Sequence, residues 1–212
     1  MRLEDVIMQI TKIEIQKKRK DRYNIYIDDE FRFGVDEGTL IDFDLRKDRE
    51  ISEEEVEKIE NEEVVVKAFN SAMRSLKLRD RSEKEIRDKL KQKELAVSAI
   101  DKAIKKLYRL EFLNDKRFAE MFVRDRMKLK PKGKRVLSLE LAQKGIDKDI
   151  IEEVLSELVG GEEELDLAKR VFEKAEKKYG GPEDSEAKQK IIKYMVSKGF
   201  SWDDISKIID RI

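Results

Sequence analysis

Residues 112–146 read FLNDKRFAEMFVRDRMKLKPKGKRVLSLELAQKGI, and the layout of this stretch decides the fold that we expect for most of the chain. Phe118, Phe122 and Met127 recur at a helical spacing, which gives one helix an apolar face. The helical pattern stops at Pro131 and Gly133, residues that interrupt helices. The stretch therefore begins with a helix and a break.

After the break the apolar pattern resumes in two further helices. We expect the buried side of the second helix to carry Val136, Leu137, Leu139 and Leu141. Gly145 can close this helix from a left-handed conformation, and Asp147 is the expected N-cap of the third. The inner face of the third helix is expected to carry Ile150, Ile151, Val154, Leu155 and Leu158. The stretch thus predicts a three-helix unit.

The same layout occurs three times. Residues 82–95, 133–146 and 186–200 align at offsets of about fifty residues, within the range of stacked helical repeats. Each repeat has a helix, a break and a pair of helices. We expect neighbouring repeats to pack their apolar faces against each other. The first repeat has Glu94 where the other two repeats have Gly145 and Gly199, so the sequence does not determine the geometry of the turn at Glu94. The glycines of segment 159–164 predict a hinge.

The first fifty residues follow a different, alternating pattern that is typical of strands. Residues 13–15, 23–27 and 31–35 predict a three-stranded antiparallel meander. One face of such a sheet needs a cover. We expect a helix at 39–45 to provide it, with three residues pointing inward: Leu40, Ile41 and Phe43. Ser52 and Glu55 form a predicted capping box for a long helix that reaches Leu76, with a possible second cap at Asn61.

These patterns predict a mainly α protein of tandem three-helix repeats in an elongated arrangement, preceded by a small N-terminal antiparallel β-meander. The expected domains are residues 1–50, the meander with a short helix; 51–110, a linker helix and the first repeat; 111–160, the second repeat; and 161–212, the third repeat.

Composition excludes several kinds of chemistry. Of the 212 residues 45% are charged, with 48 basic and 48 acidic side chains, and histidine and cysteine are absent. Nucleophiles activated by histidine, His-ligated zinc and thiolate metal sites are therefore impossible. We see no signal peptide and no apolar run that spans a bilayer. We expect a cytoplasmic protein that is not an enzyme and that uses no cofactor or metal.

Charge is segregated along the chain. Residues 116–135 contain nine basic residues and two acids, whereas 50–63 contain eight acids and one base, and 149–166 contain eight acids and no base. Solvated helix faces remain one explanation. A basic surface that binds an acidic surface or a phosphate backbone is the other.

The aromatic residues of the repeats could in principle contact nucleic-acid bases. Because Phe118 and Phe122 lie at helical spacing within an apolar stripe, we expect them in the core. We also expect Trp202 to pack against neighbouring helices, with contact to a partner as the alternative.

Three segments carry a family resemblance: RSEKEIRDKL (81–90), FLNDKRFAEMFVRDR (112–126) and KGKRVLSLELAQKGI (132–146). Together they resemble RecX, the bacterial modulator of the RecA recombinase, strongly over residues 64–158 and weakly over the third repeat. The residues that match the family pattern are Arg81, Ser82, Leu90, Phe118, Ala119, Arg126, Gly133, Leu141, Lys144 and Gly145.

The resemblance implies a protein that lies in the groove of the RecA–DNA filament and inhibits ATP hydrolysis and strand exchange in recombination, DNA repair and the SOS response. Its partners would be the RecA filament and DNA, the latter reached through the filament or bound weakly, with no membrane, and the protein would be a monomer. The residues that we predict to contact partner or nucleic acid are Arg74, Arg79, Arg81, Arg87, Arg117, Arg124, Arg126, Lys128, Lys130, Lys132, Lys134 and Arg135.

Two other hypotheses remain open. The basic block also suits a protein that binds single-stranded DNA directly and competes with the recombinase for it. The charged helix faces also suit a helical adaptor for an unrelated partner.

Overall fold

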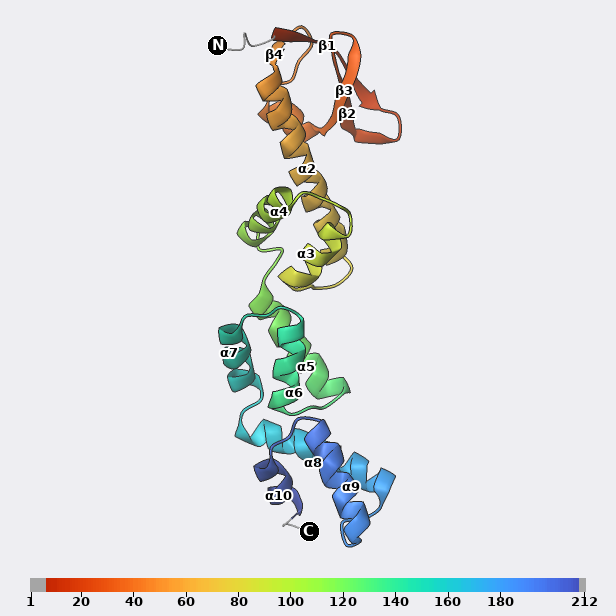
Figure 1. Cartoon of the computed structure of the whole chain (residues 1–212), viewed down its shortest axis with the longest axis vertical. Coiled ribbons are helices and arrows are strands. Elements are labelled where there is room, and N and C mark those ends of the chain that lie inside the picture. The colour runs from red at the N-terminus through yellow and green to blue at the C-terminus, as the bar shows by residue number, and fades with distance from the viewer. Residues whose placement is uncertain (1–6, 210–212) are drawn as a thin grey trace. The chain divides into compact units, whose positions relative to one another are not determined.

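The computed structural model describes residues 7–209 and divides into two compact units. The first unit contains the residues up to Leu78 and Arg87–Phe112, and the second contains Arg79–Ile86 and the residues from Leu113 onward. The elements of each unit can be followed by label and colour in Figure 1. The described elements are a small antiparallel sheet and helices in repeated groups of three, which confirms the predicted mainly α fold with three-helix repeats and an N-terminal β-meander.

The sheet opens the first unit. Its strands are β1 (Ile7–Gln16), β2 (Arg19–Ile27), β3 (Glu30–Asp36) and β4 (Glu50–Ser52), in the order β3-β2-β1-β4 with antiparallel pairing. Asp28 and Asp29 both have positive φ, of 48° and 67°, as a tight two-residue hairpin requires. The predicted meander is confirmed, and β4 adds a fourth strand beside β1 that the sequence analysis did not find.

Helix α1 (Glu37–Asp42) corrects the expected cover of the sheet. Asp36 caps it by accepting a hydrogen bond from the Thr39 backbone nitrogen at 2.9 Å. The helix ends before Asp44, whose φ is +46°, so Leu45 lies beyond it but is still buried. Leu40 and Phe43 pack against the sheet core, but Ile41 is 68% exposed. The expectation that Ile41 points inward was wrong, because Ile41 follows Leu40 directly and is turned about 100° round the helix from the side that faces the sheet.

Helix α2 (Glu53–Leu76) follows, and Ser52 and Glu55 form the predicted capping box at its start. The helix is continuous, so the second cap expected at Asn61 is not there. Val56 and Ile59 join the apolar core of the sheet. Beside them Arg22 Nη2 donates to Glu63 Oε2 at 2.6 Å, and both side chains are buried. This ion pair joins β2 to α2, and the sequence analysis missed it.

The first repeat continues with α3 (Glu83–Lys91) and α4 (Val97–Arg109). Between them Glu94 has a φ of +58°, in the left-handed region that Gly145 also occupies with a φ of +79°. The backbone nitrogen of Glu94 donates to the Lys91 carbonyl at 2.8 Å, just as that of Gly145 donates to Ala142 at 2.9 Å. The turn geometry is therefore kept although the first repeat lacks the glycine.

The second unit holds the second and third repeats. Their helices are α5 (Asp115–Leu129), α6 (Lys134–Gln143), α7 (Lys148–Leu158), α8 (Gly161–Tyr179), α9 (Ser185–Ser197) and α10 (Trp202–Ile209). A single apolar cluster runs from Phe118 to Ile208, so these two repeats share one core. This agrees with the expectation that neighbouring repeats bury apolar surface against each other. Asp147 caps α7 as predicted.

Two expectations about buried side chains in these repeats were wrong. Leu139 is 57% exposed, because Leu137 and Leu141 on α6 already face the core and Leu139 lies on the other side of the helix. Trp202 is 63% exposed at the first position of α10. It does not pack in the core, and partner contact remains its open alternative. Phe118 is buried as expected, while Phe122 is half-buried and stacks on it with ring centroids 6.1 Å apart.

Candidate functional site

Two hydrogen bonds in the second unit lie at equivalent places in successive repeats, and each is accepted by the carbonyl of a lysine. Ser82 Oγ donates to the Lys144 carbonyl at 2.7 Å, and the Gly133 backbone nitrogen donates to the Lys198 carbonyl at 3.0 Å. Ser82 and Gly133 occupy the same position in the aligned repeats, and so do Lys144 and Lys198. We call these contacts the first and second junctions.

A carboxylate completes each junction. Asp115 accepts a hydrogen bond from the backbone nitrogen of Glu83 at 2.8 Å, and Glu164 accepts one from that of Lys134 at 3.1 Å. The first residues of α3 and α6 are thereby capped by side chains from α5 and α8, which satisfies amides that a helix leaves unpaired. Desolvation by burial raises the pKa of Asp115. The repeat therefore extends to individual hydrogen bonds.

Half of the twelve predicted contact residues form ion pairs within the chain. Arg126 and Lys132 share Glu140, and Arg126 also lies over the Phe122 ring at 4.5 Å. The other pairs are Arg79 with Glu85, Arg87 with Asp101, Arg117 with Asp80 and Lys134 with Glu164. Arg81 is half-buried and also engaged. Five predicted residues form no ion pair with any described residue: Arg74, Arg124, Lys128, Lys130 and Arg135.

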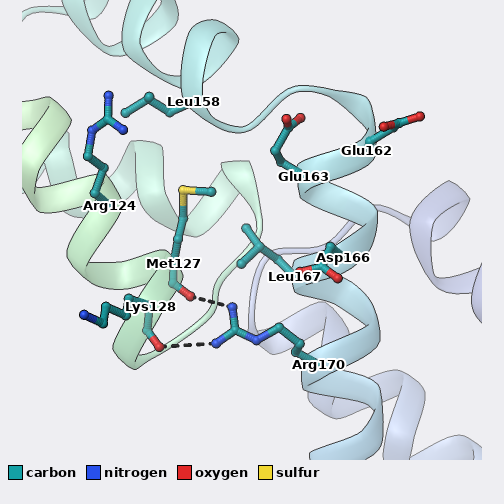
Figure 2. A pocket seen from close by; sticks show the side chains of 9 residues that line it. All are labelled: Arg124, Met127, Lys128, Leu158, Glu162, Glu163, Asp166, Leu167 and Arg170. Atoms are coloured by element: carbon teal, nitrogen blue, oxygen red, sulfur yellow. Dashed lines mark hydrogen bonds between the residues drawn. The ribbon is translucent and has the colours of Figure 1, made fainter.

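Two of those five, Arg124 and Lys128, line a cleft of about 710 Å³ between α5, the end of α7 and α8. Figure 2 shows these two cations on the α5 wall, with acidic side chains on the α8 wall opposite. The acidic residues are Glu162, Glu163 and Asp166, and the apolar ones are Met127, Leu158 and Leu167. We call this the mixed-charge cleft, because it presents both signs around an apolar surface.

Arg170 holds the two walls of this cleft together. Its guanidinium donates to the Met127 carbonyl at 2.9 Å and to the Lys128 carbonyl at 3.2 Å, as the dashed lines in Figure 2 mark. These carbonyls belong to the last turn of α5, where a helix has unsatisfied acceptors and a partial negative charge. Arg170 therefore stabilises the end of α5 against α8.

A second cleft, of about 310 Å³, lies on the other side of Arg170. It is lined by five cations: Lys130, Lys132, Arg170, Lys174 and Lys198. Leu129, Pro131, Val171 and Tyr194 complete its lining, and no carboxylate occurs among the described residues that line it. We call it the basic cleft.

The equivalent cleft at the first junction has a different character. It measures about 230 Å³ and is lined by Arg79, Asp80, Phe118, Met121, Phe122, Asp125 and Lys144. Arg79 and Lys144 both bind Glu85, at 3.0 and 2.7 Å, and Asp80 lies 3.7 Å from Arg117. We call it the neutralised cleft.

The carboxylates beside these clefts have shifted pKa values. Burial acts to raise the pKa of Glu85, but hydrogen bonds from Arg79 and Lys144 outweigh it and lower the pKa to about 2. Burial also acts to raise the pKa of Glu140, and Lys132 and Arg126 likewise lower it overall. Both carboxylates stay ionised at neutral pH and bind their cations.

Within residues 7–209 we find no group of side chains that could hold a metal ion, and no helix long and apolar enough to cross a bilayer.

Four family models match successive parts of the chain. Residues 8–52 match the regulatory protein RecX N-terminal domain, and residues 68–107, 114–155 and 162–209 match the first, second and third three-helix domains of RecX. The chain belongs to the RecX family. The resemblance noted from the sequence is thereby confirmed and extends over the N-terminal sheet and the third repeat as well.

Curated relatives and solved structures support the same family assignment. "Regulatory protein RecX" of Listeria welshimeri is 39% identical over 194 residues, which cover 92% of this chain and 72% of the relative. The regulatory protein RecX of Bacillus subtilis is 39% identical over 203 residues, which cover 96% of this chain and 76% of the relative. A crystal structure of regulatory protein RecX is 31% identical with a TM-score of 0.83 over 97% of this chain and all of the other. The crystal structure of RecX from Lactobacillus salivarius is 33% identical, with a TM-score of 0.63, and the match covers 70% of this chain and 96% of the other.

Sequence reasoning missed part of what lines the clefts of this RecX-family chain. Glu162, Glu163 and Asp166 were noted only as part of an acidic block, and Lys174 and Lys198 were not considered. Lys198 could have been found, because it aligns with Lys144, a residue that matches the RecX pattern. No local signal marks Lys174, which reaches the basic cleft through the packing of α8.

Proposed function

We propose that this RecX-family chain is a non-enzymatic regulator that binds in the groove of the RecA–DNA filament and inhibits its ATPase and strand-exchange activities. It would thereby modulate homologous recombination, DNA repair and the SOS response, acting as a cytoplasmic monomer. Its curated relatives are named as regulatory proteins. The observation that carries the proposal is the mixed-charge cleft.

The walls of that cleft favour a protein segment as occupant. Arg124 and Lys128 are four residues apart on α5 and so lie on one face of the helix. Three carboxylates of α8 stand opposite them, and these would repel a phosphate backbone. Met127, Leu158 and Leu167 offer an apolar surface between the charges. A segment of a RecA protomer with acidic and basic side chains around an apolar residue would complement all three features.

Inhibition of the DNA-dependent ATPase of RecA tests this proposal. Changing Arg124 and Lys128 to Glu makes every charge in the cleft negative except Arg170, and we expect the concentration for half-maximal inhibition to rise at least about tenfold, since a charge repulsion across an interface costs several kcal/mol. Arg126 stays unchanged, because it binds Glu140 and lies over Phe122, so its loss would disturb the fold.

The matched control replaces Lys169 and Lys177 by Glu. Both are exposed on α8 outside the cleft, and the double variant alters net charge equally. It should inhibit within about twofold of the parent, because exposed charges outside a contact have small effects. Full inhibition by the Arg124 and Lys128 variant, with unchanged thermal unfolding in both, would refute the role of this cleft.

Salt separates filament binding from competition for naked DNA. Binding to single strands weakens steeply with added salt. We expect inhibition to persist at a salt concentration at which a gel shift shows no complex with naked single-stranded DNA. Inhibition that disappears together with the naked-DNA complex would favour the competitor hypothesis.

A further inference from the structure

The basic cleft concentrates positive charge that the fold itself does not neutralise. Lys130, Lys174 and Lys198 form no ion pair with any described residue, whereas Lys132 binds Glu140. Arg170 donates hydrogen bonds to two backbone carbonyls, and because these acceptors are neutral, the positive charge of its guanidinium is not neutralised. In a chain with equal numbers of acids and bases, a cleft lined by five cations and no acid departs from local neutralisation.

The backbone around the cleft holds these cations in position. The Gly133 backbone nitrogen donates to the Lys198 carbonyl at 3.0 Å, which fixes the end of α9 beside the segment that carries Lys130 and Lys132. The Lys198 ammonium lies 4.9 Å from the centroid of the Tyr194 ring, within the range of a cation–π contact. Lys198 is therefore placed before any ligand arrives.

Tyr194 adds an aromatic ring and a phenolic hydroxyl to the lining. Its ring packs edge-on against Tyr179 at 6.0 Å, and Lys178 lies 4.8 Å from the centroid of the Tyr179 ring. Protein grooves that follow single-stranded nucleic acid combine a row of cations with aromatic side chains. The basic cleft shows this combination, and the mixed-charge cleft, which has no aromatic lining residue in the described structure, does not.

We infer that the basic cleft binds the sugar–phosphate backbone of single-stranded nucleic acid, with Lys130, Lys174 and Lys198 as the phosphate contacts. Phosphodiesters suit the cleft because it presents positive charge without a carboxylate to repel them. Its volume of about 310 Å³ lies at the small end of protein ligand sites, so it admits part of one strand. The inference goes beyond the proposed function, which requires only a protein contact, and does not depend on it.

Fluorescence anisotropy with a labelled oligodeoxythymidine and no recombinase tests the inference. We expect the Lys130→Ala, Lys174→Ala, Lys198→Ala variant to bind at least about tenfold more weakly at low salt. Its slope of log affinity against log salt should be shallower by about 2, because each phosphate contact on a single strand contributes about 0.7. The three side chains form no ion pairs, and the contact of Lys198 with the Tyr194 ring is a weak cation–π interaction, so thermal unfolding should change little, and circular dichroism checks this.

The matched control removes three other exposed lysines: Lys169→Ala, Lys177→Ala and Lys193→Ala. They lie on the same two helices, α8 and α9, but outside the basic cleft. The control should keep its affinity within about twofold and its salt slope within about 0.5 of the parent, since it removes no phosphate contact. An equal loss in the control would overturn the inference by showing that overall charge, not the cleft, binds DNA.

Two further outcomes would also overturn the inference. One is a cleft variant that binds the oligonucleotide as the parent does. The other is a poly-glutamate peptide of equal charge that binds as tightly and loses affinity in the same variant, which would make the cleft a site for acidic protein segments. Because no recombinase is present, either outcome leaves the proposed filament binding untouched.

Discussion

The basic cleft and the neutralised cleft occupy equivalent places in successive repeats, yet they differ in charge. Each lies beside a junction where the break of one repeat contacts the turn between the last two helices of the next. The basic cleft has five cations and no acid among its described lining residues. The neutralised cleft has two of each sign and exposes Met121 instead.

The difference teaches that both junctions keep a hydrogen bond to an equivalent lysine carbonyl, while the donor of that bond and the side chains beside it change. At the first junction, polar groups fasten the contact: the Ser82 hydroxyl and the Glu85 ion pairs. At the second, Gly133 and Gly199 let two backbones approach, and Val136 stands at the position of Glu85. Three predictions test this contrast.

The largest effect should come from placing alanine at the equivalent positions 82 and 133. A Cβ on Gly133 would overlap the Gly199 carbonyl group and lie 2.7 Å from the Phe200 backbone nitrogen. We expect Gly133→Ala to lower the free energy of unfolding by about 3 kcal/mol, at the upper end of overpacking costs. Ser82→Ala loses one hydrogen bond to Lys144 and the cap of α3, which costs about 1–2 kcal/mol. Urea unfolding measures both, and a larger loss for Ser82→Ala would contradict the contrast.

A smaller effect should follow from making the neutralised cleft resemble the basic one. Changing Asp80 and Asp125 to Lys should tighten binding of single-stranded DNA and steepen its salt slope by about 1.4, if each new cation gains one phosphate contact. Anisotropy titrations at several salt concentrations measure this. The control changes Asp149 and Glu157 to Lys on α7, outside both clefts, and an equal gain there would show that total charge alone sets the affinity.

The smallest effect concerns pH and only the first junction. The pKa of Glu85 is about 2 in the folded protein, below its ordinary value of 4.5. A depressed pKa stabilises the folded state above the ordinary value, and this contribution disappears as the pH falls from about 4.5 toward 2. Compared with Glu85→Gln, the parent should therefore be more stable at neutral pH by up to about 1 kcal/mol after solvent screening.

Thermal unfolding from pH 7 to pH 2 measures that difference. The parent and Glu85→Gln should converge toward pH 2, and a difference that stays constant would refute the ion-pair origin. Val136→Ile, at the equivalent position of the second junction, serves as the control, because no carboxylate stands there and its effect should not vary with pH.

The fold was more predictable from the sequence than the candidate site. Ser52, Asp147 and Gly145 were assigned correctly as caps because capping depends on residues within one turn. Ile41, Leu139 and Trp202 were placed wrongly because apolar character alone does not say on which side of a short helix a residue lies. Whether a predicted contact residue is paired within the chain depends on its neighbours in space. Arg126 and Lys132, for example, both bind Glu140.

The sequence by itself determined most of the secondary structure, the threefold repeat and the RecX resemblance, because periodicity, caps and breaks are local properties of the chain. Strand β4 is the exception, because it forms through its pairing with β1. The tertiary structure alone decided which charges remain available to a partner. Arg126 and Glu140 are 14 residues apart, Lys144 and Glu85 are 59 apart, and Lys130 and Lys198 meet in one cleft across more than one repeat. Electrostatic interactions depend on distance in space, and no pattern along the chain records that distance.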